Sequence, residues 1–301
     1  MYNSFNKAMK KRFGCKIYKL SLSGGMTCPT RDGTLGTRGC IFCSAEGSGD
    51  FAAKPCNSIT EQIEHAKQLV KNKAKDAKYI AYFQDYTNTY APTDRLRELF
   101  TAAIEPDDIV ALSIGTRPDC LPDDVIKLLS ELNKQKPVFV ELGLQTIHES
   151  TAEYIRRGYK LEVFDDAYKR LKAAGIEVIV HIILGLPGET EDMIFDTVRY
   201  LADIKIDGIK LQLLHVLEGT DLADDYRKGM FDVYNIDTYI YILKECLRLL
   251  PPETVIHRLT GDGAKAKLIA PLWSADKKNV LNTINREFKK DNVKQGGNYN
   301  K

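Results

Sequence analysis

The hydrophobic pattern predicts a chain in which short apolar strands alternate with amphipathic helices. Seven runs are rich in β-branched and apolar residues, as expected for parallel strands that are buried on both faces. They cover residues 16–22, 78–83, 108–114, 137–144, 177–184, 208–216 and 254–259.

Helix signals fill the intervals between these runs. Ser58, followed by Glu61, forms a capping-box pattern, and apolar residues recur at helical spacing from Ile59 to Val70. Further helices are expected at 161–174, 190–204 and 236–250; the first ends at a glycine and the last at two prolines.

Strands that alternate with helices favour βαβ units and a parallel sheet. The sequence therefore predicts an α/β fold, a partial (β/α)6 barrel of about six parallel strands with a helical extension at its C-terminus. We expect a basic N-terminal extension at 1–13, the barrel core at 14–250 and the C-terminal extension at 251–301. In such folds the chemistry lies at the carboxyl ends of the strands.

Composition is that of an ordinary soluble globular protein, with 44% hydrophobic and 28% charged residues among 301. No apolar run approaches the roughly 20 residues that span a bilayer. The basic start is not followed by the apolar stretch of a signal peptide. We therefore expect a cytoplasmic protein with no membrane partner.

Positive charge is concentrated at the two ends of the chain. Residues 1–20 carry six basic and no acidic side chains, and residues 277–301 carry seven basic and two acidic ones. This distribution suggests an anionic partner such as RNA, but it is equally consistent with ends that are merely well solvated.

A glycine-rich loop directly after the first strand holds Cys28, Cys40 and Cys43, with eleven residues in the first gap and two in the second. Three identities compete for this group. A structural zinc site needs four ligands, and only Cys15 or Cys56 could complete one. Unrelated buried cysteines explain Cys120 and Cys246 but not this spacing. A three-cysteine [4Fe–4S] cluster fits best, because it leaves one iron open to a ligand.

Several common catalytic motifs are absent from the sequence. The five histidines do not pair as in H-E-x-x-H, and neither a G-x-S-x-G elbow nor a Walker loop occurs.

The cysteine loop, read with seven later phrases, resembles the radical S-adenosylmethionine (SAM) superfamily. Most of that superfamily has three residues in the first gap, whereas the longer gap here resembles the Elp3-related branch. Within that branch CPTRDGTLGTRGCIFC is similar to the YhcC/YtqA (MnmL-like) family. The later phrases are FQDYTNTYAP, SIGTRPDCL, ELGLQT, HIILGLPGE, LQLLHVLEGT, HRLTGDG and PLW.

The resemblance implies a [4Fe–4S] cluster on the three cysteines and SAM as the second cofactor. It implies that Gln145 and Arg157 bind SAM, with Arg157 at its carboxylate, and that His181 lies near its ribose. Gln84 stands where relatives have a Gly-Gly-Glu motif for the SAM ammonium. Glu141 lies on the same strand face as Gln145, so we include it among the SAM-binding candidates; a carboxylate in an apolar run also needs a partner.

Four further polar residues are candidates for substrate contact on position alone. Gln212 and His215 alternate with apolar residues, as inward-facing groups on a strand would. His257 and Arg258 occupy the last predicted strand.

The resemblance implies reductive cleavage of SAM to a 5′-deoxyadenosyl radical, used to modify the wobble uridine of tRNA from carboxymethylaminomethyl to aminomethyl. The implied partners are the tRNA anticodon stem-loop and an electron donor such as flavodoxin or ferredoxin. Two alternatives stay open: a radical SAM enzyme acting on a small molecule, and a non-catalytic zinc-dependent nucleic-acid-binding protein.

Overall fold

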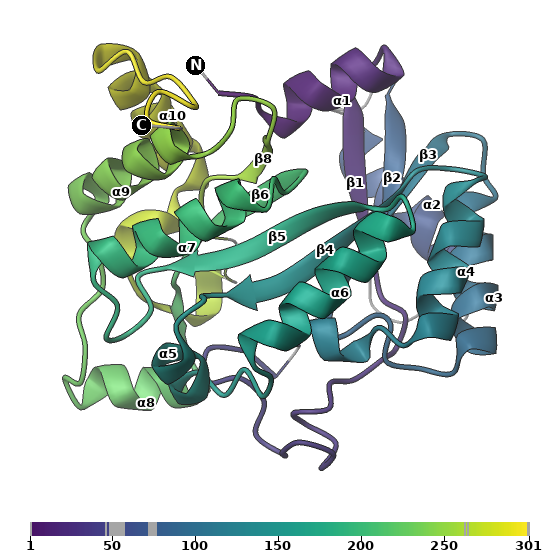
Figure 1. Ribbon diagram of the computed structural model, residues 1–301, viewed down its shortest axis with the longest axis horizontal. Coiled ribbons are helices and arrows are strands. Elements are labelled where there is room, and N and C mark those ends of the chain that lie inside the picture. The colour runs from purple at the N-terminus through teal and green to yellow at the C-terminus, as the bar shows by residue number, and fades with distance from the viewer. Residues whose placement is uncertain are drawn as a thin grey trace.

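The computed structural model describes residues 2–45, 47, 58–71, 77–261, 263 and 265–299. Within these residues the main feature is a curled sheet of seven parallel strands, in the order β1-β2-β3-β4-β5-β6-β8 (Figure 1). The strands are β1 Ile17–Leu22, β2 Lys78–Phe83, β3 Ile109–Thr116, β4 Val138–Gln145, β5 Glu177–Leu184, β6 Gly208–Leu213 and β8 Val255–Arg258. The predicted partial α/β barrel is therefore confirmed.

The predicted run 208–216 is longer than the strand that forms. β6 ends at Leu213, and Val216 pairs instead with Ala270 in a separate antiparallel sheet of β7 (Val216–Leu217) and β9 (Leu268–Ala270). The chain leaves the barrel at this point, so the alternation of inward and outward side chains does not continue beyond Leu213.

Helices cover the outer face of the curled sheet, as Figure 1 shows for α6 and α7. Ser58 accepts a hydrogen bond from the Glu61 N–H at the start of α2, and Thr190 caps α7 in the same way. The helices are α1 Phe5–Phe13, α2 Ile59–Val70, α3 Thr93–Ile104, α4 Asp123–Asn133, α5 Glu149–Tyr154, α6 Leu161–Ala173, α7 Glu191–Asp203, α8 Asp221–Arg227, α9 Ile236–Leu249 and α10 Lys277–Lys290.

The largest apolar core lies between the sheet and these helices, and a smaller one fills the amino end of the barrel. Met9 of α1 packs in that smaller core against Ile17, Ile80 and Phe139, which come from three different strands. Helix α1 therefore closes the amino end of the barrel and leaves the carboxyl ends of the strands for a site.

The C-terminal part of the chain contributes to the barrel itself. β8 pairs with β6, and the Ile256 N–H of β8 also donates a backbone hydrogen bond to the Asn3 carbonyl in the segment before α1. The predicted boundaries at residues 13 and 250 stay a prediction, and the sheet runs across the second of them.

The basic helix α1 lies at the end of the strands opposite the cysteine loop (Figure 1). Its positive side chains are therefore remote from the carboxyl ends of the strands. Of the helices that the structure describes, none combines the length and apolarity that crossing a membrane requires.

Candidate active site

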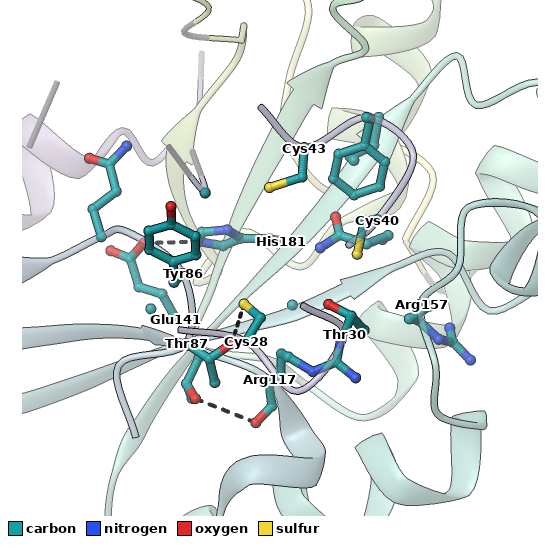
Figure 2. Close-up of a pocket in the computed structure, with 18 of the residues that line it drawn as sticks. Cys28, Thr30, Cys40, Cys43, Tyr86, Thr87, Arg117, Glu141, Arg157 and His181 are labelled. Carbon is teal, nitrogen blue, oxygen red and sulfur yellow. Dashed lines mark hydrogen bonds and ion pairs between the residues drawn. The ribbon is translucent and has the colours of Figure 1, made fainter. Parts of the chain in front are cut away.

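The loop after β1 carries three cysteines into one pocket. After Leu22 the chain crosses the carboxyl ends of the strands, where Cys28, Cys40 and Cys43 line a shared cavity. Figure 2 shows their sulfur atoms facing the same space from different sides. The loop is thus at the end of the barrel where the fold predicts chemistry.

Short backbone hydrogen bonds shape this loop. The Arg31 N–H donates to the Cys28 carbonyl (2.9 Å), and the Cys43 N–H donates to the Cys40 carbonyl (3.0 Å). The Arg31 guanidinium then donates to the Cys43 carbonyl (3.1 Å). Gly39 has φ +72°, and a Cβ there would lie 2.8 Å from Arg31 Nε. A glycine at this point therefore lets the guanidinium cross the loop and hold its two halves together.

The thiols occupy a partly desolvated environment. Burial raises the pKa of Cys28 and of Cys40, the latter to about 12, while Arg117 and Arg31 act in the opposite direction. The Thr87 hydroxyl lies 2.8 Å from Cys28 Sγ. Cys43 beside them also raises the pKa of Cys28 and of Cys40, so a strongly cationic group is needed to hold these two as thiolates.

Below the cysteines, one buried carboxylate links its own strand, β4, to four others. Glu141 of β4 is 1% exposed. Its Oε1 accepts hydrogen bonds from Lys19 of β1 and Ser113 of β3, the latter at 2.8 Å. Its Oε2 accepts from His181 of β5 (2.9 Å) and Lys210 of β6. The expected partner for this carboxylate is thus a set of four donors.

The ionisable side chains around Glu141 shift the pKa values of one another. Burial opposes ionisation of Glu141, but Lys19 and Lys210 outweigh it and hold the Glu141 pKa well below its usual value. Burial lowers the pKa of Lys210 to about 7, and Lys19 shifts in the same direction. Burial, assisted by Lys210, lowers the pKa of His181 to about 4. His181 is therefore neutral at pH 7 and donates through Nε2.

The pocket gathers most of the polar residues that the sequence singled out. Besides the three cysteines, its lining includes the predicted residues Gln84, Glu141, Gln145, Arg157, His181, Gln212 and Arg258.

Two predicted residues lie outside this lining. The His257 ring packs on Phe5 of α1, with ring centroids 4.9 Å apart. His215 follows the end of β6, and its ring lies so close to Gly261 that an added Cβ would be 2.6 Å away. The structure thus separates His215 and His257 from Gln212 and Arg258, and their proposed contact with the substrate stays a prediction.

Comparisons with known proteins agree with this geometry. A model of the radical SAM superfamily matches residues 34–201, and a model of the Radical_SAM C-terminal domain matches residues 206–290. The uncharacterized protein YtqA of Bacillus subtilis is 45% identical over 295 residues, covering 98% of this chain and 92% of that protein. The chain belongs to the radical SAM superfamily.

More distant similarity connects this radical SAM chain to Elp3 proteins. The structure of archaeal Elp3 from Methanocaldococcus infernus superposes with a TM-score of 0.69 at 20% identity, covering 93% of this chain and 64% of that chain. A tRNA uridine(34) acetyltransferase of Methanocaldococcus jannaschii is 31% identical over 156 residues, 51% of this chain and 28% of that protein. The expected placement beside YhcC/YtqA and Elp3-related proteins is confirmed.

Radical SAM proteins use a [4Fe–4S] cluster and SAM, and the thiol geometry suits such a cluster. Among the described residues, no three His, Cys, Asp or Glu side chains are grouped closely enough for a single metal ion. The three thiols nevertheless face one cavity, and in a [4Fe–4S] cluster each thiolate binds a different iron. Cys15, Cys120 and Cys246 are outside this lining, and Cys56 lies outside the described residues.

The neighbouring part of the radical SAM pocket has features of a ligand site. Gln145 Oε1 is buried there and has no hydrogen-bond partner among the described residues, and its backbone adopts φ +70°. Gly115 and Gly143 also line the pocket, and a Cβ at Gly143 would lie 3.1 Å from Gln145 Nε2. An orphaned buried oxygen on a strained backbone is characteristic of functional sites, so the residues present fit a bound polar cofactor.

Hydrogen bonds to protein groups hold the Arg157 guanidinium in place. The side chain is 2% exposed, and its guanidinium donates to the carbonyls of Tyr159 (2.9 Å), Thr146 (2.6 Å) and Leu144 (3.3 Å) and to Glu149 (3.0 Å). Four of its five N–H donors are thereby used. Its main visible effect is to fix the carboxyl end of β4, and its predicted contact with SAM stays a prediction.

Sequence reasoning missed several residues that shape the site. Arg31 and Arg117 act electrostatically on the thiols, Thr87 contacts Cys28, and Lys19 and Lys210 flank Glu141. One signal was available for the lysines, since each stands alone among apolar residues in a strand. A buried lysine requires a carboxylate.

Proposed function

We propose that this radical SAM enzyme modifies the wobble uridine of tRNA, converting a carboxymethylaminomethyl group to an aminomethyl group. In this step the bond between the nitrogen and the carboxymethyl carbon breaks, SAM serves as the oxidant and is released as 5′-deoxyadenosine and methionine, and water completes the release of the two carbons as glyoxylate. In this proposal Cys28, Cys40 and Cys43 hold the cluster, and SAM binds at the remaining iron. The single observation that carries the assignment of ligands is the convergence of these three thiols on one pocket at the carboxyl ends of the strands.

Several residues beside the cysteines each contribute a contact to SAM. Gln145 offers a buried acceptor that lacks a partner, and Gly143 leaves room for the cofactor beside it. Gln84, which lines the same pocket, provides a further polar contact in place of the Gly-Gly-Glu motif. His181, neutral and fixed by Glu141, presents its ring towards the ribose.

The two cofactors, when bound, supply one-electron chemistry that no amino-acid side chain provides. The protein's task is to bind, orient and shield. Arg31 and Gly39 hold the cysteine loop closed, Arg157 fixes the end of β4, and burial keeps water away from the reacting groups. An electron donor such as flavodoxin or ferredoxin completes the system.

Two observations support tRNA as the substrate. The first is the similarity to a protein named tRNA uridine(34) acetyltransferase. The second is Tyr86, which lines the pocket with the Arg31 guanidinium 5.7 Å from its ring. An aromatic ring with an adjacent arginine is a suitable platform for an unpaired base.

Nucleoside analysis of tRNA tests this function. Cells that lack the protein are expected to accumulate carboxymethylaminomethyl nucleosides and lose the aminomethyl ones, because the proposed step is missing. Complementation with the native chain should restore the aminomethyl nucleosides, whereas complementation with Cys40→Ala should not. If every wobble nucleoside is unchanged in the deletion, the tRNA assignment is wrong.

A further inference from the structure

Two ammonium groups share one carboxylate at the floor of the pocket, by which we mean the layer formed by Glu141, Lys19 and Lys210. Every ion pair that these two lysines make within the described residues is with Glu141. The Lys210 side chain is 4% exposed and that of Lys19 is 17% exposed. When both lysines are protonated, the three groups together carry one net positive charge in a buried place.

Lys210 also has an unused donor. An ammonium group has three N–H donors, and two of them are taken by Glu141 and by the Tyr82 hydroxyl at 2.9 Å. No described residue accepts the third. Lys210 lines the cysteine pocket, and so does Arg258, its neighbour across the β6–β8 pairing.

The approach to these cations is from the cysteine side. Beneath them, Ile17, Ile80, Phe139 and Met9 form the apolar layer that closes the amino end of the barrel. Of the described residues that line the pocket, five are basic and Glu141 alone is acidic. Asp119 pairs with Arg117 and Glu149 pairs with Arg157, whereas Lys210 and Arg258 lie opposite each other in the β6–β8 pairing and line the pocket together.

An isolated charge in a protein interior costs several kcal/mol unless a partner neutralises it. A chain that keeps two ammonium groups on one carboxylate, facing a ligand pocket, is arranged to receive a second anion. We propose that Lys210, with Arg258 beside it, forms a subsite that binds a carboxylate group of the substrate.

This inference rests on the proposed function and adds a way for the enzyme to distinguish its substrate from its product. The carboxymethylaminomethyl group carries a carboxylate, and the aminomethyl product carries only an ammonium. The subsite attracts the substrate and repels the product, so the same two cations favour binding before the reaction and release after it.

Equilibrium binding of RNA tests the subsite directly. The probes are two anticodon stem-loops that differ only in their wobble nucleoside, carboxymethylaminomethyluridine or aminomethyluridine, added to the reconstituted protein saturated with SAM. The native protein is expected to bind the first at least tenfold more tightly. Lys210→Met should abolish this preference, and Lys127→Met, at an exposed position on α4, should keep it. A preference that survives Lys210→Met overturns the proposal.

A second measurement separates this inference from the tRNA assignment. Sodium acetate, compared with acetamide and with sodium chloride of equal ionic strength, should raise the melting temperature of the SAM-saturated native protein but not of Lys210→Met. If acetate raises the melting temperature of the native protein but not of Lys210→Met, while the native protein binds both RNAs equally, the subsite stands and the tRNA assignment fails. If acetate has no such effect and the RNAs are not distinguished, the subsite is refuted.

Glu141→Gln is a second variant that tests the subsite even if Lys210→Met folds poorly. This change removes the resident anion, and added acetate can take its place beside Lys19 and Lys210 and favour their protonated forms, so acetate should stabilise Glu141→Gln more than it stabilises the native protein. An equal or smaller effect of acetate on this variant contradicts an anion site at Lys210.

Discussion

The hydroxyl of Thr87 lies 2.8 Å from the sulfur of Cys28 (Figure 2). Thr87 follows β2 and Cys28 follows β1, so the contact joins two adjacent strand ends at the proposed cluster. Hydrogen bonds to cluster sulfurs are one of the factors that set a cluster's reduction potential. A donor to a thiolate stabilises the reduced, more negative state and therefore raises the potential.

We accordingly predict that Thr87→Val lowers the reduction potential of the cluster. A difference of about 1 kcal/mol in the strength of one charge-assisted hydrogen bond corresponds to roughly 40 mV for one electron. A redox titration followed by electron paramagnetic resonance measures the shift. Thr87→Ser keeps the donor and should keep the potential; equal potentials in Thr87→Val and the native protein would rule the contact out.

The second prediction concerns the cluster ligands. Cys40→Ala should lose iron, sulfide and SAM cleavage together, because the pocket then offers only two of its three thiols. Cys246 is fully buried in α9 and remote from the pocket, so Cys246→Ala should retain all three properties. Iron and sulfide analysis after anaerobic reconstitution decides this, and loss of the cluster in Cys246→Ala would mean that the ligands are misassigned.

The third prediction uses the space above Gly143, which lies on the same strand face as Glu141. A Cβ at Gly143 would be 3.1 Å from Gln145 Nε2, and a valine would project further into the pocket. Gly143→Val should weaken SAM binding more than tenfold, about 1.4 kcal/mol, with the iron content unchanged. Equilibrium dialysis with SAM measures this, and Gly143→Ala should give an intermediate affinity. Native affinity in the valine variant would place SAM elsewhere.

The fourth prediction concerns stability. Glu141→Ala leaves Lys19 and Lys210 buried without their carboxylate, and removing one partner of a buried ion pair costs about 3–5 kcal/mol. The matched control is Glu64→Ala, because Glu64 pairs with Lys67 at a site where its side chain is 60% exposed. That change should cost below about 1 kcal/mol. Urea unfolding compares the two, and similar losses would show that the Glu141 network adds little.

The fifth prediction is a pH dependence of stability that arises from His181. Its pKa is lowered to about 4 by burial and by Lys210, against an ordinary 6.5. As the pH falls from about 6.5 to about 4, the unfolded chain takes up a proton that the folded chain refuses, so the free energy of unfolding decreases.

The groups that face His181 are Glu141, Lys210 and Arg258. His257, whose pKa is also lowered by burial, adds a slope of the same sign. His181→Gln should therefore flatten part of the decline between pH 6.5 and pH 4, as measured by urea unfolding at several pH values. An unaltered slope would show that folding does not lower the pKa of His181.

Much of the fold is encoded locally and was therefore predictable. β2 and β5 begin and end at the predicted residues, since their apolar, β-branched runs are bounded by polar segments. Ser58 caps α2 as expected because the capping interaction spans only three residues. The position of the cysteine loop followed from a general property of parallel barrels.

The site was less predictable because its contacts are non-local. The sequence indicated that Glu141 needs a partner, but Lys19 and Lys210 are 122 and 69 residues away from it, and only the order of strands brings them together. His215 was expected to face inward by alternation, a rule that ended with β6 at Leu213. His257 and Arg258 lie at an irregular register with β6, and the structure brings only Arg258 into the lining.

The Glu141 network also bears on how the polypeptide acquires its native state. Its donors come from β1, β3, β5 and β6, so the full set of hydrogen bonds to Glu141 can form only after synthesis has passed residue 210. A nascent or truncated chain that ends after β5 would carry the carboxylate without Lys210. The segments matched by the two family models, 34–201 and 206–290, each contribute to this network. We expect residues 1–205 and 206–301, expressed separately, to become stable only when recombined.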